Sequence, residues 1–200
     1  MNIIEYEKVK GYTYLEYCDY LQNKYGIGLS NYMTKSWVKN PKCSRTKEGL
    51  MIHHKFENYA IRLSKKVFAE KHPFDWQQAE NLIYCDFLEH LFLHLLICEE
   101  AIKNNTQQKA LGIRGIIFYI VPELNDVFCG WRSKLQWQIN CHERIINDKA
   151  VYLIILKRFK EHCSEYPFYH KDCLHSSLND KFGIWSIKKN KVLFQEIDKL

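Results

Sequence analysis

Residues 49–98 decide the fold, and they read GLMIHHKFENYAIRLSKKVFAEKHPFDWQQAENLIYCDFLEHLFLHLLIC. Within this stretch a short apolar run, 50–52, leads into the pair His53 and His54. Apolar runs of this length are typical of a strand, so we expect a strand that carries both imidazoles at its end. Neighbouring side chains of a strand point to opposite faces, which allows the two histidines to have different roles.

A second strand and a helix follow at the other end of the stretch. The run 82–85 is β-prone, and Asp86 can cap a helix in which Glu89 completes a capping-box pattern. His90 and His94 lie four residues apart on that helix, which places them nearly above one another on one face. Strand, strand and helix would then deliver three imidazoles to one point.

The composition indicates a globular protein of one domain. The chain has 200 residues, of which 46% are hydrophobic, enough for a buried core. Its net charge of +6 favours an anionic partner without establishing one. No apolar run is long enough to cross a bilayer, and the eight cysteines include no C-x-x-C pair. We therefore expect a cytoplasmic protein with reduced thiols and no membrane partner.

The expected fold class is α+β and mostly helical, with three regions along the chain. Residues 1–48 form an N-terminal helical and basic lead-in, in which 12–24 reads as a helix. Residues 49–103 form the core, and residues 104–200 form a mainly helical C-terminal region packed on it. Periodicity does not decide whether the apolar run 111–124 is a strand or a buried helix.

Further helices are predicted from apolar spacing. An inserted helix with a basic side is expected between His54 and Asn81, and residues 148–163 read as an amphipathic helix with Asp148 as its cap. The apolar positions of the inserted helix are Ile61, Leu63, Val67 and Phe68. Another helix is predicted from residues four apart, which are Trp131, Leu135 and Ile139.

The histidine pattern resembles the HNH, or His-Me finger, endonucleases, whose ββα-metal core occurs in colicin-type nucleases, homing endonucleases and some restriction enzymes. The family pattern is an apolar strand ending in His-His, an Asn in a Glu-Asn-Leu context, and a helix bearing ligands. Here those features are residues 52–54, residues 80–82, and His90 with His94. His90 falls nine residues after Asn81, with His94 four further on, which is similar to the colicin-type version. The long segment between the two strands departs from the family, where a shorter loop is common.

Carried over residue by residue, the resemblance implies a metal-dependent endonuclease that hydrolyses DNA phosphodiester bonds. His53, His90 and His94 would hold one divalent cation, and His54 would be the general base. Asn81 would hold the connecting loop and orient His54, or would ligate the metal itself. Such an activity fits restriction-type defence, or a phage or another mobile element.

The ligand set bears on the choice of metal. Three imidazoles favour zinc, manganese, nickel or cobalt, because magnesium prefers oxygen ligands. Magnesium would fit if Asn81 and a carboxylate such as Asp86 or Glu89 contributed instead. One cation serves one strand, so cutting duplex DNA through both strands would need a homodimer or two successive nicks.

Several basic side chains near the histidines are candidates for phosphate contacts with DNA, against the alternative of an ordinary solvated surface. They are Arg45, Lys47, Arg62, Lys65 and Lys66. A second metal site in the last third of the chain is a weaker idea because the spacing there is irregular. Its histidines would be His142, His162, His170 and His175.

Two functions of another class stay open. One is a non-catalytic module that binds nucleic acid or protein, such as an inhibitor, and keeps the ββα-metal scaffold as a structural zinc site. Zinc held by four protein ligands, with no position left for water, would favour that function. The other is a transcriptional regulator, which is weaker because no recognisable DNA-reading helix is present in the sequence.

Overall fold

A two-stranded antiparallel sheet followed by a long helix forms the centre of the fold. In the computed structural model, which describes residues 1–170, 172–178 and 187–200, strand β1 is Met51–His54 and strand β2 is Leu82–Cys85. His53 lies opposite Ile83 and His54 opposite Leu82 in the register. Helix α4, Phe87–Lys103, begins immediately after β2. The structure is therefore α+β and mostly helical, as expected.

The remaining helices surround this centre. They are α1 Ile3–Val9, α2 Tyr14–Tyr25, α3 Lys66–Ala69, α5 Ile113–Gly115, α6 Val121–Phe128, α7 Gln136–Glu143, α8 Lys149–Cys163 and α9 Ile187–Asp198, with a π-helical turn at Ile116–Ile120. Short 3₁₀ turns occur at Pro41–Cys43, Thr46–Glu48, Lys55–Asn58, Phe74–Gln77, Ala79–Asn81 and Gln107–Lys109. None of the described helices has the length and apolar character needed to cross a membrane.

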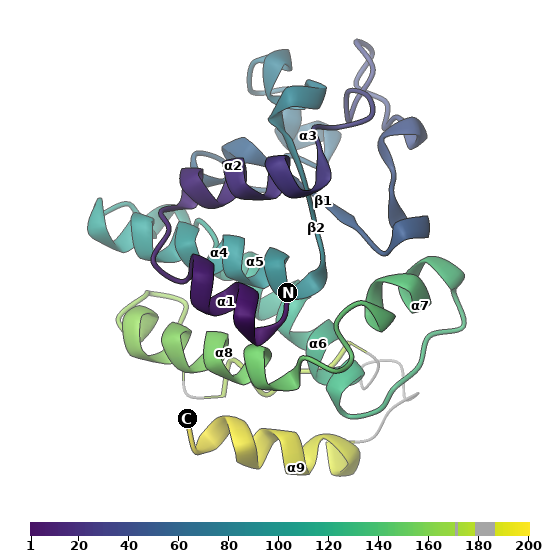
Figure 1. The fold of residues 1–200 in the computed structure, drawn as a ribbon. Helices are drawn as coiled ribbons and strands as arrows, with labels where there is room; N and C mark the ends of the chain where they lie inside the picture. The colour runs from purple at the N-terminus through teal and green to yellow at the C-terminus, as the bar shows by residue number, and fades with distance from the viewer. Residues whose placement is uncertain (171, 179–186) are drawn as a thin grey trace.

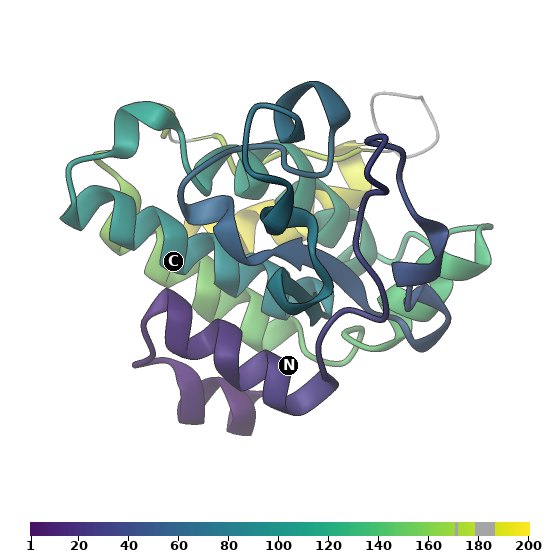
Figure 2. The same ribbon diagram turned by 90° about the horizontal axis from the view of Figure 1, so that it is seen from above.

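Helix α4 is buried on nearly all sides, and the other elements are arranged around it. It packs against α2, α8, α5 and the π-helical turn, as well as against both strands. Figure 1 shows α2, α4, α8 and α9 as successive layers. Figure 2 shows the segment 26–81 lying over the top of these layers. A helix that is apolar all round is stable only when it is enclosed in this way.

The start of α4 is determined by local chemistry. The Asp86 side chain accepts a hydrogen bond from the Glu89 backbone N–H at 2.8 Å, and Glu89 accepts one from the Asp86 N–H at 2.7 Å. This reciprocal pair satisfies two amide groups that the helix cannot satisfy itself, and such caps stabilise a helix by about 1 kcal/mol. The predicted capping box is confirmed, and it fixes where His90 and His94 fall on the helix.

Helix α2 also follows the prediction closely. Thr13 and Glu16 form a second capping box, and Gly26, at a φ of 83°, ends the helix near the expected residue. Helix α1 was not predicted; it is short, and most of its side chains are exposed.

The segment between the strands is less helical than predicted. Only Lys66–Ala69 forms an α-helix there, and the rest consists of 3₁₀ turns and loop. Ile61 and Leu63 precede the helix, and Arg62 between them has a φ of 59°, which interrupts helical geometry. Leu63 is fully buried whereas Val67 is exposed. The apolar residues therefore anchor a loop to the core instead of forming one face of a helix.

In the C-terminal region the structure decides one open question and corrects two predictions. The apolar run that periodicity left undecided is helical, because α5, the π-helical turn and α6 follow one another there. Helix α7 covers Ile139 but begins after Trp131 and Leu135. Helix α8 matches the predicted range, although the Asp148 side chain at its start makes no capping hydrogen bond.

Candidate metal centre

The structure brings His53, His90 and His94 together. One ring nitrogen from each lies within 4.8 Å of the others. The closest pair is Nε2 of His90 and Nε2 of His94, which are 3.2 Å apart. Strand β1 supplies the first imidazole and α4 supplies the other two, one turn apart. This buried group could hold a metal ion.

The hydrogen bonds around His53 leave one of its nitrogens free. Tyr14, on α2, donates its hydroxyl proton to the carbonyl of Lys55 at 2.9 Å. The hydroxyl can therefore only accept from Nε2 of His53, which lies 2.9 Å away. Nδ1 of His53 is then unprotonated, and it is buried with no hydrogen-bond partner among the described residues. A lone pair in that position is what a metal ligand requires.

His94 is oriented in the same way by a backbone carbonyl. Its Nδ1 lies 3.2 Å from the oxygen of Gly112, and because a carbonyl only accepts, Nδ1 must carry the proton. Nε2 is thus the unprotonated nitrogen, and it faces His90. Gly112, at a φ of 77°, and Gly115 both lie against this region: a Cβ at Gly115 would come within 2.4 Å of the His94 ring. Both glycines are needed for this close approach.

Burial keeps the three imidazoles neutral. It lowers the pKa of His53 to about 3, with the nearby Glu57 opposing the shift. Burial also lowers the pKa of His94, and burial together with the other two histidines lowers that of His90 well below its ordinary value. Neutral imidazole is the form that binds metal, so no proton has to be displaced at neutral pH.

Glu57 is a member of the cluster that sequence reasoning missed. It lies in the 3₁₀ turn after β1, and its carboxylate is 3.5 Å from Nδ1 of His53, 3.5 Å from Nε2 of His94 and 3.7 Å from Nδ1 of His54. Burial alone would raise its pKa, but the neighbouring histidines, His53 first, hold that pKa well below its usual range. The carboxylate is therefore ionised. The one feature of the sequence that could have indicated Glu57 is its position, three residues after the histidine pair.

His54 lies beside the cluster and is separately fixed. Gln77 donates its amide to the carbonyl of Leu63 at 3.2 Å, so its Oε1 faces Nε2 of His54 at 3.3 Å. Nε2 must then carry the proton, which leaves Nδ1 of His54 as the free base on the side of Glu57. The ring also packs edge-on against Tyr32, with centroids 4.5 Å apart. Sequence reasoning missed Gln77, because nothing local marks it.

The other predicted site residues lie in different surroundings. Asn81 donates its side-chain amide to the carbonyl of Asp75 at 2.8 Å, so it ties the connecting loop together, while the hydrogen bond to His54 comes from Gln77. Asp86 and Glu89 form the α4 cap and do not face the imidazoles. The carboxylate at the histidines is that of Glu57.

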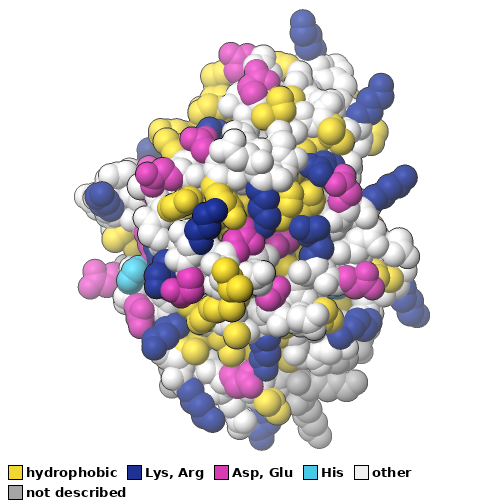
Figure 3. All heavy atoms as spheres, viewed as in Figure 1, with side chains coloured by type: hydrophobic (Ala, Val, Ile, Leu, Met, Phe, Trp, Pro, Cys, Tyr) yellow, Lys and Arg dark blue, Asp and Glu magenta, His cyan; other side chains and the backbone are white. Residues whose placement is uncertain are grey.

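The candidate phosphate contacts fall into two groups. Arg45 is engaged within the fold, because its guanidinium forks onto Glu48 and packs over the Tyr84 ring, 4.7 Å from the centroid. The side chains of the other candidates are exposed, and these are Lys47, Arg62, Lys65 and Lys66. Figure 3 shows Lys and Arg spread over the visible face, interspersed with acidic side chains, without one continuous basic patch.

The C-terminal histidines do not form a second centre. His142 pairs with Glu123 at 2.7 Å, His162 with Glu99 at 2.6 Å, and His175 with Asp198 at 3.1 Å. Across the described part of the chain, the histidines of β1 and α4 are the single group placed to hold a metal. Comparison with known proteins adds no family: no family model, no curated protein and no solved structure matches this chain.

Proposed function

We propose that this protein is a metal-dependent endonuclease of the HNH type, which hydrolyses phosphodiester bonds of duplex DNA. The observation that carries the proposal is the meeting of His53, His90 and His94 beside a fourth histidine, His54, whose free nitrogen faces the same side. The placement of the four histidines supports the roles that the resemblance implies for them. A restriction-type or mobile-element setting remains part of the proposal.

The donor set fits a borderline metal ion. Three neutral imidazoles suit zinc, nickel, cobalt or manganese better than magnesium. Ligand atoms roughly 2.1 Å from a tetrahedral zinc ion stand about 3.4 Å from one another. The separation of 3.2 Å between the His90 and His94 nitrogens is close to that edge length. When bound, the cation would stabilise negative charge on the phosphoryl oxygens and on the departing 3′ oxygen.

The protein's own part in the reaction is proton removal by His54. Its Nδ1 is directed to the face where the cluster's free nitrogens meet, so a water molecule there could give up a proton as it attacks phosphorus. Gln77 keeps Nε2 protonated and so holds His54 in the tautomer that this role requires. Asn81 would act indirectly, by holding the loop that carries Gln77.

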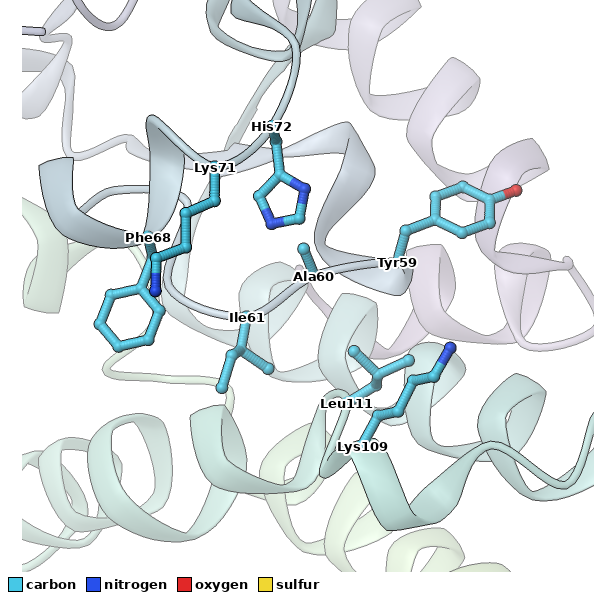
Figure 4. Close-up of a pocket in the computed structure, with 8 residues that line it drawn as sticks. All are labelled: Tyr59, Ala60, Ile61, Phe68, Lys71, His72, Lys109 and Leu111. Carbon is cyan, nitrogen blue, oxygen red and sulfur yellow. The ribbon is translucent and has the colours of Figure 1, made fainter.

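A pocket formed partly by the segment between the two strands supports a nucleic-acid substrate. It has a volume of about 220 Å³ and lies between the 55–81 segment and the 107–111 turn. Figure 4 shows Phe68, Lys71 and His72 above it, with Lys109 and Leu111 below. Aromatic rings can stack on bases, and lysines pair with phosphates. The pocket and the metal centre are connected through the chain, because Leu111, which lines the pocket, directly precedes Gly112, whose carbonyl lies 3.2 Å from Nδ1 of His94.

Plasmid cleavage tests the proposal. Purified protein with zinc, manganese, nickel or magnesium should convert supercoiled plasmid to nicked or linear DNA, and a chelator should abolish the conversion. His54→Ala should reduce cleavage by about 100-fold or more, as removal of a general base does. His162→Ala, at an exposed histidine outside the cluster, is the matched control and should cut normally. Unchanged cleavage by His54→Ala would reject the role given to His54.

The variant Gln77→Leu tests whether Gln77 positions His54 for catalysis or only supports the loop in which it lies. The loss of the hydrogen bond to His54 should lower kcat about tenfold and shift the pH dependence of cleavage, while metal affinity stays unchanged. A drop in metal affinity or in folding without a changed pH profile would mean that Gln77 only supports the loop.

The alternative, a structural metal unit without catalysis, is favoured by one observation, the proximity of Glu57. A carboxylate that completes four protein ligands would leave no open position, as in structural zinc sites. In that case a chelator should unfold the protein, and no metal should produce cleavage. The plasmid assay thus distinguishes the nuclease from the structural metal unit, whatever effect the chelator has on thermal stability.

A further inference from the structure

Glu57 stands where a cation and a substrate would both need room. Its carboxylate is 3.5 Å from the free nitrogen of His53 and 3.5 Å from that of His94, on the metal side of the site. It is also 3.7 Å from Nδ1 of His54, the proposed base. The side chain is 17% exposed, so it lies at the solvent edge of an otherwise buried cluster. One carboxylate therefore lies beside two of the three imidazole ligands and beside the proposed base.

These distances fit a shared cation better than direct hydrogen bonds. The direct histidine–carboxylate pairs elsewhere in the molecule, His142 with Glu123 and His162 with Glu99, are 2.7 and 2.6 Å long. Separations of 3.5 Å exceed hydrogen-bond length but match the edges of about 3.4 Å in a tetrahedral zinc site. The nitrogens that face Glu57 are moreover the ones that Tyr14 and Gly112 leave unprotonated.

The charge at Glu57 points the same way. Among the described residues, three histidines are its only ion-pair partners, and no lysine or arginine pairs with it. A largely buried carboxylate without a lysine or arginine partner is costly. A divalent cation between the carboxylate and the imidazoles would neutralise it.

We propose that Glu57 is the fourth protein ligand of the cation and closes the coordination position that a phosphate group would occupy. The first part concerns the metal centre alone. The second part rests on the proposed nuclease function, because the scissile phosphate would have to lie between the cation and His54, where the carboxylate now lies. Carboxylate and phosphate are both anions with oxygen donors, so they compete for one position. Substrate would then bind by displacing Glu57.

The turn that carries Glu57 is tied down at its backbone and at both ends, which leaves the side chain as the part that moves. Tyr14 holds the carbonyl of Lys55, whose ammonium pairs with Asp19 at 2.7 Å. On the other side, the side-chain amide of the buried Asn58 lies 3.5 Å from the Glu100 carboxylate. Rotation of one partly exposed side chain is therefore enough to open the site, without any change in the strands or in α4.

Cobalt binding tests this directly, because four-coordinate Co²⁺ absorbs visible light far more strongly than five- or six-coordinate Co²⁺. The wild-type protein should give the intense four-coordinate spectrum, with little response to inorganic phosphate. Glu57→Gln should weaken Co²⁺ binding by at least about tenfold. Its spectrum should respond to phosphate at concentrations several-fold lower than the wild type needs. Glu70→Gln, which makes the same charge change at an exposed position of the same segment, should behave as the wild type.

Equal Co²⁺ affinity and equal spectra for Glu57→Gln and the wild type would overturn the proposal. If Glu57→Gln does not fold, as judged by circular dichroism, the wild type decides alone: a weak spectrum of five- or six-coordinate Co²⁺ in the absence of phosphate shows a position that Glu57 does not close and also overturns it. These readouts involve no DNA. If the protein shows the expected cobalt behaviour but never cuts plasmid, Glu57 is a ligand and the proposed nuclease function is wrong. If it cuts plasmid but Glu57→Gln and the wild type bind Co²⁺ alike, the nuclease function stands and Glu57 is not a ligand.

Discussion

Histidines occur in two very different settings in this molecule. His53, His90 and His94 meet one another, and His53 and His94 share a single carboxylate, Glu57, at 3.5 Å. In the C-terminal half, by contrast, His142, His162 and His175 contact carboxylates at 2.7, 2.6 and 3.1 Å. The comparison teaches that a count of histidines and acids does not identify a metal centre. What matters is whether several unprotonated nitrogens converge on one point while the nearest carboxylate lies beyond hydrogen-bond distance from them.

The largest expected effect comes from removing one histidine from each setting and comparing zinc binding and stability. His94→Ala should weaken zinc binding by about 100-fold or more, because it deletes a ligand and leaves two. His142→Ala should leave zinc binding unchanged but lower the free energy of unfolding by about 1–3 kcal/mol, since the largely buried Glu123 loses the shorter of its two side-chain hydrogen bonds. Calorimetric titration and urea unfolding measure the two effects. Equal loss of zinc affinity in both variants would show that the two settings do not differ.

A second test alters the support of a ligand and leaves all ligands in place. Gly115→Ala puts a Cβ within 2.4 Å of the His94 ring, so the imidazole must move and zinc affinity should fall by about tenfold. Gly11→Ala is the matched control, because a Cβ at Gly11 meets nothing within 4 Å. If both alanine variants bind zinc like the wild type, the centre tolerates displacement of His94 and is not preorganised by α5.

Acid stability sharpens the comparison in the metal-free protein. The pKa of His53 is about 3 in the folded state, whereas an exposed histidine in the unfolded chain has a pKa near 6.5. Below pH of about 6.5 the unfolded chain therefore binds a proton that folded His53 does not, and stability falls as the pH decreases towards 3. The slope from this residue is at most about 1.4 kcal/mol per pH unit. Urea midpoints measured in chelator should fall less steeply for His53→Gln, and parallel curves would contradict the shift.

The smallest expected effect concerns the pocket that Lys71 lines. Lys71→Ala should weaken DNA binding a few-fold and lower the salt slope by about one, because one phosphate contact is lost. Glu48 already engages Arg45, so Arg45→Ala should act mainly on stability. Fluorescence anisotropy at several salt concentrations distinguishes the two. A larger change in the salt slope for Arg45→Ala than for Lys71→Ala would indicate that the DNA backbone contacts Arg45 and not the pocket that Lys71 lines.

Local sequence alone determined the elements that hold the ligands. Strands β1 and β2 and the start of α4 follow from short-range patterns, because a capping box and a β-prone run act over only a few residues. The same patterns put His53, His90 and His94 on elements that could meet. Longer-range predictions were weaker: apolar spacing suggested a helix at Ile61 and Leu63, where these side chains instead anchor a loop.

Only the tertiary structure decided what surrounds those ligands. Tyr14 comes from α2, Gly112 from the turn before α5, and Gln77 from a loop, and each fixes one imidazole across a long stretch of chain. Glu57 is near in sequence, but a glutamate after a strand usually faces solvent, and its role depends on how the turn folds back over the cluster. Hydrogen-bond partners and tautomers depend on packing between distant segments, which no short-range pattern encodes.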